Sequence, residues 1–215
     1  MATISALASI AIIVVSLLAG FLAFYLISDL SKMEKKKQIG ELTSQLMNFV
    51  IFIWLGKILL NFSIFVRDPL AILAYPSNSS AFYLALFFSA VTIAIKSKRE
   101  QLDVLSLGKS FIYVFLIGSF VYEFIQIVWN NDTYSVSSMI LLAVLIIFFL
   151  FMRERVTTDL LLIIMVIGWT AGTLALAYIM PFTMVFGFTM APWFLVLFLI
   201  VFLTLMMLKK RKKVL

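Results

Sequence analysis

The sequence predicts an all-α fold, a polytopic membrane bundle of seven transmembrane helices. The chain is 64% hydrophobic and only 13% charged, whereas soluble domains are close to half apolar and a quarter charged. Its apolar residues gather in seven stretches of about the length needed to cross a bilayer. Basic residues stand in short runs beside these stretches, as in multi-pass membrane proteins. At 215 residues, we expect a single transmembrane domain over residues 1–215.

Short polar or basic segments separate the seven predicted spans. The first span has no Lys or Arg before it and is longer than the apolar part of a signal peptide, so we expect a retained helix. The third span is short for a full crossing. The apolar segment from Leu70 to Tyr75 is too short to cross, and we interpret it as interfacial or re-entrant. The spans cover about residues 4–27, 43–66, 81–95, 109–130, 136–152, 160–180 and 184–208.

The distribution of basic residues predicts the orientation of the helices. Loops alternate between the two sides of a membrane, and Lys and Arg are concentrated on the cytoplasmic side. Of the 17 Lys and Arg, only Arg67 falls on the opposite side, and Lys57 lies within a span. We therefore expect the N-terminus outside and the C-terminus in the cytoplasm, and we interpret the net charge of +7 as orientation rather than nucleic-acid binding. The cytoplasmic set is Lys32, Lys35, Lys36, Lys37, Lys96, Lys98, Arg99, Lys109, Arg153, Arg155, Lys209, Lys210, Arg211, Lys212 and Lys213.

The chain contains no cysteine and no histidine. Disulfides, thiolate metal sites and thiol nucleophiles are therefore excluded. The commonest metal ligand and the commonest general base near neutral pH are missing as well. We predict no catalytic residue, no metal site and no cofactor, and the sequence favours a non-enzymatic role. Gly168 and Gly172 stand one turn apart in the sixth span, a spacing typical of close helix packing.

The fourth span carries a polar stripe from Ser119 onward. Successive polar residues at helical spacing fall within an arc of roughly 100° on one face of the helix. The most costly member is Glu123, because a carboxylate inside a bilayer costs several kcal/mol unless it is paired or hydrated. The stripe therefore predicts a polar cavity or a polar partner. Its members are Ser119, Tyr122, Glu123, Gln126 and Asn130.

A second ionisable residue, Lys57, lies near the middle of the second predicted span, with Asn61 one turn later. At 1.5 Å per residue, the predicted depths of Lys57 and Glu123 differ by only about 3 Å. We hypothesise that the two face each other across a polar cavity open to the outer leaflet. The alternatives are a salt bridge that only sets helix register, or a Lys57 side chain that reaches the interface alone. The candidate ligand-binding residues are Lys57, Asn61, Ser119, Tyr122, Glu123 and Gln126.

Short motifs between Trp54 and Asn130, roughly a third of the chain, carry a family resemblance. Gly56-Lys57-Ile58 resembles a Gly-Ala-Arg-Leu stretch, and residues 68–73 resemble the Asn/Asp-Pro stretch that follows it. Residues 116–120, Leu-Ile-Gly-Ser-Phe, resemble the signature Arg-Ile-Gly-Asn-Phe. These motifs resemble prolipoprotein diacylglyceryl transferase, the bacterial enzyme that moves diacylglyceryl from phosphatidylglycerol to a lipobox cysteine. Seven spans with the N-terminus outside is also that family's topology.

The chain departs from the family at its signature residues. Leu116 replaces the signature arginine and Ser119 the signature asparagine. The family's His-Gly-Gly motif would fall near residues 79–81, which read Ser-Ser-Ala, and its later glutamate would fall at Phe124, one residue after Glu123. The resemblance therefore implies a transferase-like fold without the transferase chemistry.

The resemblance implies a bacterial plasma-membrane protein that binds lipid or a lipoprotein. Lys57 would meet the phosphate of an anionic phospholipid as a point charge, and Glu123 would hold Lys57 in place. The expected partners are an anionic phospholipid and a lipoprotein or membrane protein, with no nucleic acid. The residues leave two other functions open. One is a small transporter or channel subunit with Lys57 and Glu123 on its pathway, and the other is a scaffold within a larger complex.

Overall fold

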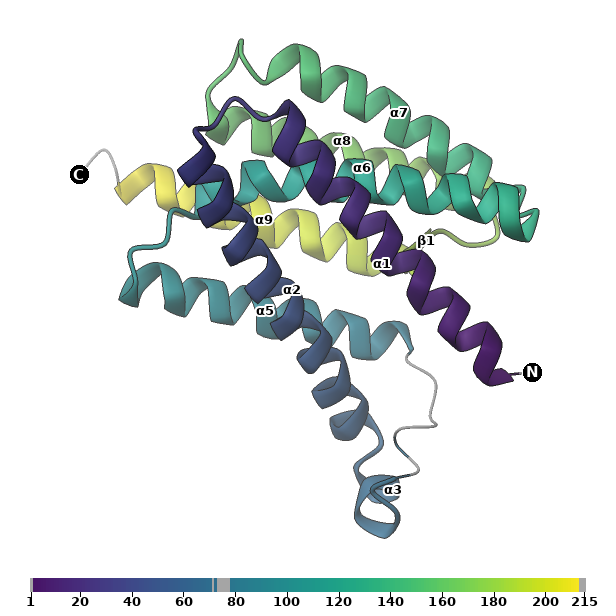
Figure 1. Ribbon diagram of the computed structural model, residues 1–215. Helices are drawn as coiled ribbons and strands as arrows, with labels where there is room; N and C mark the ends of the chain where they lie inside the picture. The colour runs from purple at the N-terminus through teal and green to yellow at the C-terminus, as the bar shows by residue number, and fades with distance from the viewer. Residues whose placement is uncertain (1, 71, 73–77, 213–215) are drawn as a thin grey trace. The chain divides into compact units, whose positions relative to one another are not determined.

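The computed structural model describes residues 2–70, 72 and 78–212, and it consists almost entirely of helices (Figure 1). Within these residues, seven helices are long and apolar enough to cross a membrane. The predicted all-α, seven-span membrane architecture is therefore confirmed. The long helices are α1 (Ala2–Ile27), α2 (Lys32–Leu60), α5 (Ser79–Arg99), α6 (Val104–Asn130), α7 (Tyr134–Met152), α8 (Thr158–Ile179) and α9 (Pro192–Lys212), and the short helix α3 covers Phe62–Arg67.

The chain divides into two compact units. One contains Met1–Lys35 together with Gly108–Leu215, and the other contains Lys36–Leu107. We call them the α6 unit and the α2–α5 unit, and each is described by itself. The expectation of a single transmembrane domain stays a prediction. Most of the predicted interfacial segment from Leu70 to Tyr75 lies outside the described residues.

The second helix begins at Lys32, not at residue 43 as predicted, because Ser31 and Glu34 form a capping box. The Ser31 backbone N–H donates to Glu34 Oε2 (2.9 Å), and the Glu34 N–H donates to Ser31 Oγ (3.3 Å). These reciprocal bonds satisfy N–H groups that a helix start otherwise leaves unpaired. The basic run before the second span is therefore helical. At its other end α2 stops at Leu60, and α3 follows after Asn61.

The third span is long enough for a full crossing, contrary to the prediction. Helix α5 has 21 residues, close to the 20 or so that a bilayer requires. It starts where the Asn78 side chain accepts a hydrogen bond from the Ala81 N–H (2.9 Å). The side-chain cap extends the helix ahead of the purely apolar stretch, and the basic residues at its C-terminal end, up to Arg99, are helical too.

The seventh span begins at Pro192, so its predicted start at residue 184 is wrong. Residues in that interval form a two-stranded antiparallel hairpin, β1 (Met184–Val185) and β2 (Phe188–Thr189). Its two-residue turn has φ 49° at Phe186 and φ 83° at Gly187, as tight hairpins require. Pro192 then supplies the first helical residue of α9, a position that proline favours.

Helix α6 is the centre of its unit and the most buried of the seven long helices. It meets α1 at Gly20, where a Cβ atom would lie 2.5 Å from the Val114 carbonyl oxygen. Ring contacts join it to α7 through Tyr113 and Phe149 (4.6 Å) and to α8 through Phe115 and Trp169 (5.4 Å). These contacts pack α6 against three other helices of its own unit.

Helices α7 and α8 pack closely in the same unit. A Cβ at Gly168 would lie 3.1 Å from Leu145 Cδ2, and one at Gly172 would lie 2.3 Å from Leu141 Cδ1. The close packing predicted for this glycine pair is confirmed.

In the α2–α5 unit the two long helices run side by side. A Cβ at Gly56 would lie 3.0 Å from the Ala81 carbonyl oxygen. The rings of Phe52 and Phe88 are 5.7 Å apart. Toward the other end, Lys96 Nζ lies 3.2 Å from Glu41 Oε2. A close backbone approach and one ion pair thus set the register of the helix pair.

Candidate functional site

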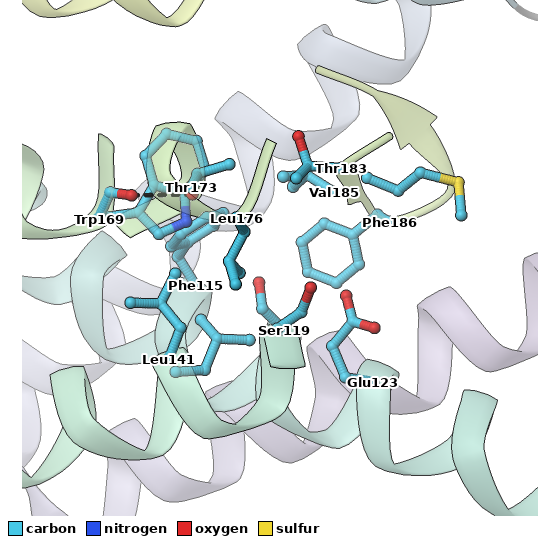
Figure 2. Close-up of a pocket in the computed structure, with 13 residues that line it drawn as sticks. Phe115, Ser119, Glu123, Leu141, Trp169, Thr173, Leu176, Thr183, Val185 and Phe186 are labelled. Atoms are coloured by element: carbon cyan, nitrogen blue, oxygen red, sulfur yellow. Dashed lines mark hydrogen bonds between the residues drawn. The ribbon is translucent and has the colours of Figure 1, made fainter. Parts of the chain in front are cut away.

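A cavity lies in the α6 unit between α6, α7, α8 and the segment that forms the hairpin (Figure 2). Its volume, counted as space open to the centre of a water molecule, is about 20 Å³, enough for roughly one water-sized guest. Three aromatic rings and five polar side chains contribute to its wall. These are Phe115, Trp169 and Phe186, and Ser119, Glu123, Ser138, Thr173 and Thr183.

Glu123 is the charged group of this cavity. Its side chain comes from the α6 stripe and is only 6% exposed. None of the ion pairs among the described residues includes it. A carboxyl group in a membrane span normally faces a partner or a wet cavity because of the cost of burying its charge. Glu123 therefore marks this cavity as the candidate functional site.

A second small cavity adjoins the first and shares Glu123, Ser138 and Thr183 with it. It is also lined by Asp132, from the turn between α6 and α7. The Ser135 hydroxyl donates to Asp132 Oδ2 (3.1 Å) and is also a hydrogen-bond partner of the Glu123 carboxyl. Asp132 also accepts from the Tyr134 N–H (3.0 Å). A hydroxyl has one proton, so Ser135 can donate to only one of the two carboxyl groups at a time.

Ser119 stands one turn before Glu123 on the same face of α6. Figure 2 shows both side chains below the ring of Phe186. The side chain of Ser119 is 6% exposed, and its Oγ is buried without a hydrogen-bond partner among the described residues. Buried hydroxyl groups are nearly always hydrogen-bonded. A guest in the cavity would supply the missing partner.

The hairpin between α8 and α9 forms the remaining wall of the cavity. At its tip, the Phe186 ring centroid lies 5.4 Å from that of Tyr122 and 6.3 Å from that of Phe115. At its base, the Met190 N–H donates to the Thr183 carbonyl (2.8 Å). The hairpin is thus held at both ends, with Phe186 against the α6 stripe.

The remaining stripe residues do not line the main cavity. Tyr122 is buried and pairs with Gln126 by a side-chain hydrogen bond. Gln126 Oε1 in turn accepts a hydrogen bond from Asn130. The stripe therefore divides in two. Ser119 and Glu123 contribute to the cavity, whereas Tyr122, Gln126 and Asn130 bond to one another along the helix.

Lys57 and Asn61 lie in the α2–α5 unit. Lys57 is 5% exposed, and its Nζ lies 4.9 Å from the ring centroid of Trp54. It takes part in none of the ion pairs among the described residues. Asn61 donates from Nδ2 to the Lys57 carbonyl oxygen (3.0 Å), not to its ammonium group. The amide therefore satisfies the backbone where α2 ends.

The predicted depth match between Lys57 and Glu123 relied on span bounds that the helices do not follow. Lys57 lies in the last turn of α2, about 4.5 Å from its end, whereas Glu123 lies about 10 Å from the end of α6. The two residues also belong to different units. Their pairing stays a prediction.

Several cavity residues escaped the sequence-based prediction. Ser138 and Thr173 lie within predicted spans, where a hydroxyl group can indicate a polar contact. The sequence around each residue does not show which neighbouring helix that hydroxyl group faces. Asp132 lies between the fourth and fifth predicted spans, where a polar residue usually belongs to a turn. Phe186 carried no signal, because its segment resembles the start of an apolar span.

A comparison of the chain with protein-family models, with curated proteins and with solved structures finds no match. The resemblance to the diacylglyceryl transferases therefore stays a prediction. The chain is a multi-pass integral membrane protein. Among the described residues, no group of three or more Asp, Glu, His or Cys is placed to hold a metal ion.

Proposed function

We propose that this integral membrane protein binds a small monovalent cation in the Glu123 cavity, as a small transporter or channel subunit would. One observation carries the proposal. A carboxyl group in a membrane span, 6% exposed, lines a cavity rich in hydroxyl groups and belongs to none of the ion pairs among the described residues. Ionisable groups in that setting mark ion or proton pathways.

Charge and size favour a small cationic group over an anionic phosphate group in this cavity. Glu123 and Asp132 both line the adjoining cavity, so an anionic group would meet like charge in a low-dielectric setting. The volume of about 20 Å³ accepts a water-sized guest. Divalent ions usually take six or more oxygen ligands, several of them carboxylates. The small acidic set here is better suited to a single positive charge.

The test of this proposal is ligand-dependent stability of the purified protein in detergent. Thermal unfolding is compared in sodium, potassium, ammonium and choline chloride at equal ionic strength and pH 7. At about 100 times its dissociation constant, a bound cation raises the unfolding midpoint by about 5–10 °C. We expect at least one small cation to do this for the wild type and for Glu154→Gln, an exposed carboxylate on the α7–α8 turn. Glu123→Gln should abolish the rise, and a rise that survives this substitution contradicts the proposal.

A flux measurement extends the test to transport. Wild-type protein in liposomes should admit the stabilising cation down its gradient, and Glu123→Gln should admit it no faster than empty liposomes do. Binding without flux would restrict the protein to the role of a cation-binding subunit.

Lys57 favours a second candidate function, the binding of an anionic phospholipid. Its ammonium group is buried over the Trp54 ring and forms no ion pair among the described residues. A phosphate would supply a charge-assisted partner. This candidate agrees with the bacterial plasma-membrane location and the lipid or lipoprotein partner that the resemblance implies.

Native mass spectrometry tests the lipid candidate. Wild-type protein should retain an anionic phospholipid, Lys57→Met should lose it, and Lys98→Met, which removes an exposed lysine of the same unit, should keep it. Equal retention by all three proteins would remove Lys57 as a lipid contact.

We expect lipid binding without group transfer, because Leu116 replaces the signature arginine and the chain has no histidine. The protein can be expressed in bacteria depleted of their own diacylglyceryl transferase. A reporter lipoprotein should then remain unmodified by mass spectrometry, and a diacylglyceryl adduct would restore the transferase function.

A further inference from the structure

We propose that the guest of the Glu123 cavity is an ammonium group and that Phe186 selects it by size. This inference rests on the proposed cation binding and specifies its ligand. The ligand is an ammonium group with at most one carbon substituent, either free, as ammonium or methylammonium, or carried by an ethanolamine phospholipid.

The walls of the cavity combine aromatic rings with a carboxylate. Phe115, Trp169 and Phe186 all line it. The ring of Phe115 makes edge contacts with Trp169 (5.4 Å, 83°) and Phe186 (6.3 Å, 74°), so both of these rings stand steeply to the Phe115 ring. Ring faces attract cations, and aromatic walls are a recurrent feature of ammonium-binding sites. Such walls bind an alkali cation less well, because it requires more oxygen ligands than aromatic rings supply.

The polar part of the wall matches the donors of an ammonium group. An ammonium carries N–H donors only and needs oxygen acceptors. Ser119 Oγ is buried without a partner among the described residues, and Glu123 contributes a carboxylate. The Thr173 hydroxyl donates to the Trp169 carbonyl (2.8 Å), so its oxygen still has lone pairs to accept with. Three acceptors and three rings thus surround one water-sized space.

The size of the cavity excludes larger ammonium groups. Ammonium is close to water in size, and the cavity of about 20 Å³ holds about one such guest. A trimethylammonium group has three more carbon atoms and would collide with the wall. Phe186 is a wall residue at the tip of the hairpin, with φ 49° beside Gly187 at φ 83°, and its ring packs against Tyr122. We therefore assign it as the specificity-determining residue.

Stability measurements in detergent test the ligand class. Ammonium and methylammonium chloride should raise the unfolding midpoint of the wild type by about 5–10 °C near saturation, whereas tetramethylammonium, sodium and potassium should not. Phe186→Ala should extend the rise to tetramethylammonium, and Phe186→Leu should do so in part. Phe148→Ala, which removes an exposed ring on α7, should keep the wild-type selectivity.

The stability results distinguish a failure of the ammonium assignment from a failure of the proposed cation binding. An equal Glu123-dependent rise with sodium or potassium overturns the ammonium assignment and leaves cation binding intact. No rise with any cation overturns both. Unchanged selectivity in folded Phe186→Ala and Phe186→Leu overturns the role of Phe186.

A lipid experiment identifies the source of the ammonium group. Protein in nanodiscs of mixed ethanolamine and choline phospholipids is analysed by native mass spectrometry. A lipid-borne guest predicts retention of ethanolamine lipid over choline lipid, lost in Glu123→Gln and displaced by methylammonium chloride. A free guest predicts no headgroup preference together with the thermal rise. Preferential retention of the choline lipid in a Glu123-dependent manner overturns the proposal.

Discussion

At the scale of single residues, the hairpin tip depends on an unusual backbone. Phe186 and Gly187 both have positive φ, a region that costs most L-residues roughly 1–2 kcal/mol. Glycine adopts it freely, whereas Phe186 is held there by its ring contacts with Tyr122 and Phe115. The position of the Phe186 ring therefore depends on its glycine neighbour.

Gly187→Ala should destabilise the folded protein by about 1–2 kcal/mol. The new Cβ would be strained at φ 83° and would lie 3.2 Å from the Tyr122 hydroxyl. Chemical or thermal unfolding in detergent measures the loss. Gly40→Ala is the matched control, because a Cβ there meets nothing within 4 Å, and alanine should stabilise helix α2 by about 0.5–1 kcal/mol. Equal effects at the two glycines would contradict the strained turn.

At the scale of helices, Arg153 joins three elements at the end of α7. Its Nη1 donates to the Ile27 carbonyl at the end of α1 (2.8 Å) and to the Tyr113 hydroxyl of α6 (3.0 Å). Asp29 lies 3.6 Å and Glu154 3.1 Å from Nη2. Burial lowers the pKa of Arg153, but the Tyr113 hydrogen bond and the two carboxylates outweigh it, so the pKa lies above its ordinary value. The group therefore stays charged and holds the three helices together.

Arg153→Met should cost about 1.5–3 kcal/mol of folding stability, because hydrogen bonds to charged groups are the stronger ones. Tyr113→Phe removes one of these bonds and should cost about 1 kcal/mol. Unfolding by denaturant in detergent measures both. The matched control is Arg155→Met, which removes an exposed guanidinium over the Phe151 ring (3.9 Å) and should cost less than about 1 kcal/mol. Similar losses of folding stability for the two arginines would show that the hydrogen bonds of Arg153 between the helices contribute little to stability.

At the scale of the whole molecule, the basic residues predict which side of the membrane each loop occupies. Seven crossings would place the two termini on opposite sides, and the N-terminus outside stays a prediction. The chain lacks cysteine, so a single introduced thiol reports its own side without background.

Thr133→Cys should react with a membrane-impermeant maleimide in intact cells, and Lys36→Cys should react only after lysis. Both residues are exposed, and Thr133 makes no side-chain cap of α7, so neither change should disturb the fold. The reverse labelling pattern would invert the predicted orientation.

The two units raise a second question at this scale, namely whether Lys57 pairs with Glu123. Removing one partner of a buried pair typically costs a few kcal/mol, whereas apolar replacement of both is often tolerated. If the residues pair, Lys57→Met with Glu123→Leu should recover the stability lost in the single variants. Strictly additive losses, measured by thermal unfolding in a buffer whose only salt cation is choline, would exclude the pair and favour an external cation as the partner of Glu123.

The sequence by itself determined the helical class, the number of long apolar helices and the presence of Ser119 and Glu123 on one face. These are local properties, because the length of an apolar stretch and its period of 3.6 residues depend on the residues of one segment alone. Two missed boundaries were local as well, because the Ser31–Glu34 capping box and Pro192 were readable signals. Only the tertiary structure decided that Thr173 and the Phe186 ring share a cavity with Glu123. Those residues come from different elements, and their meeting depends on close helix packing and on a hairpin whose turn no apolar pattern reveals.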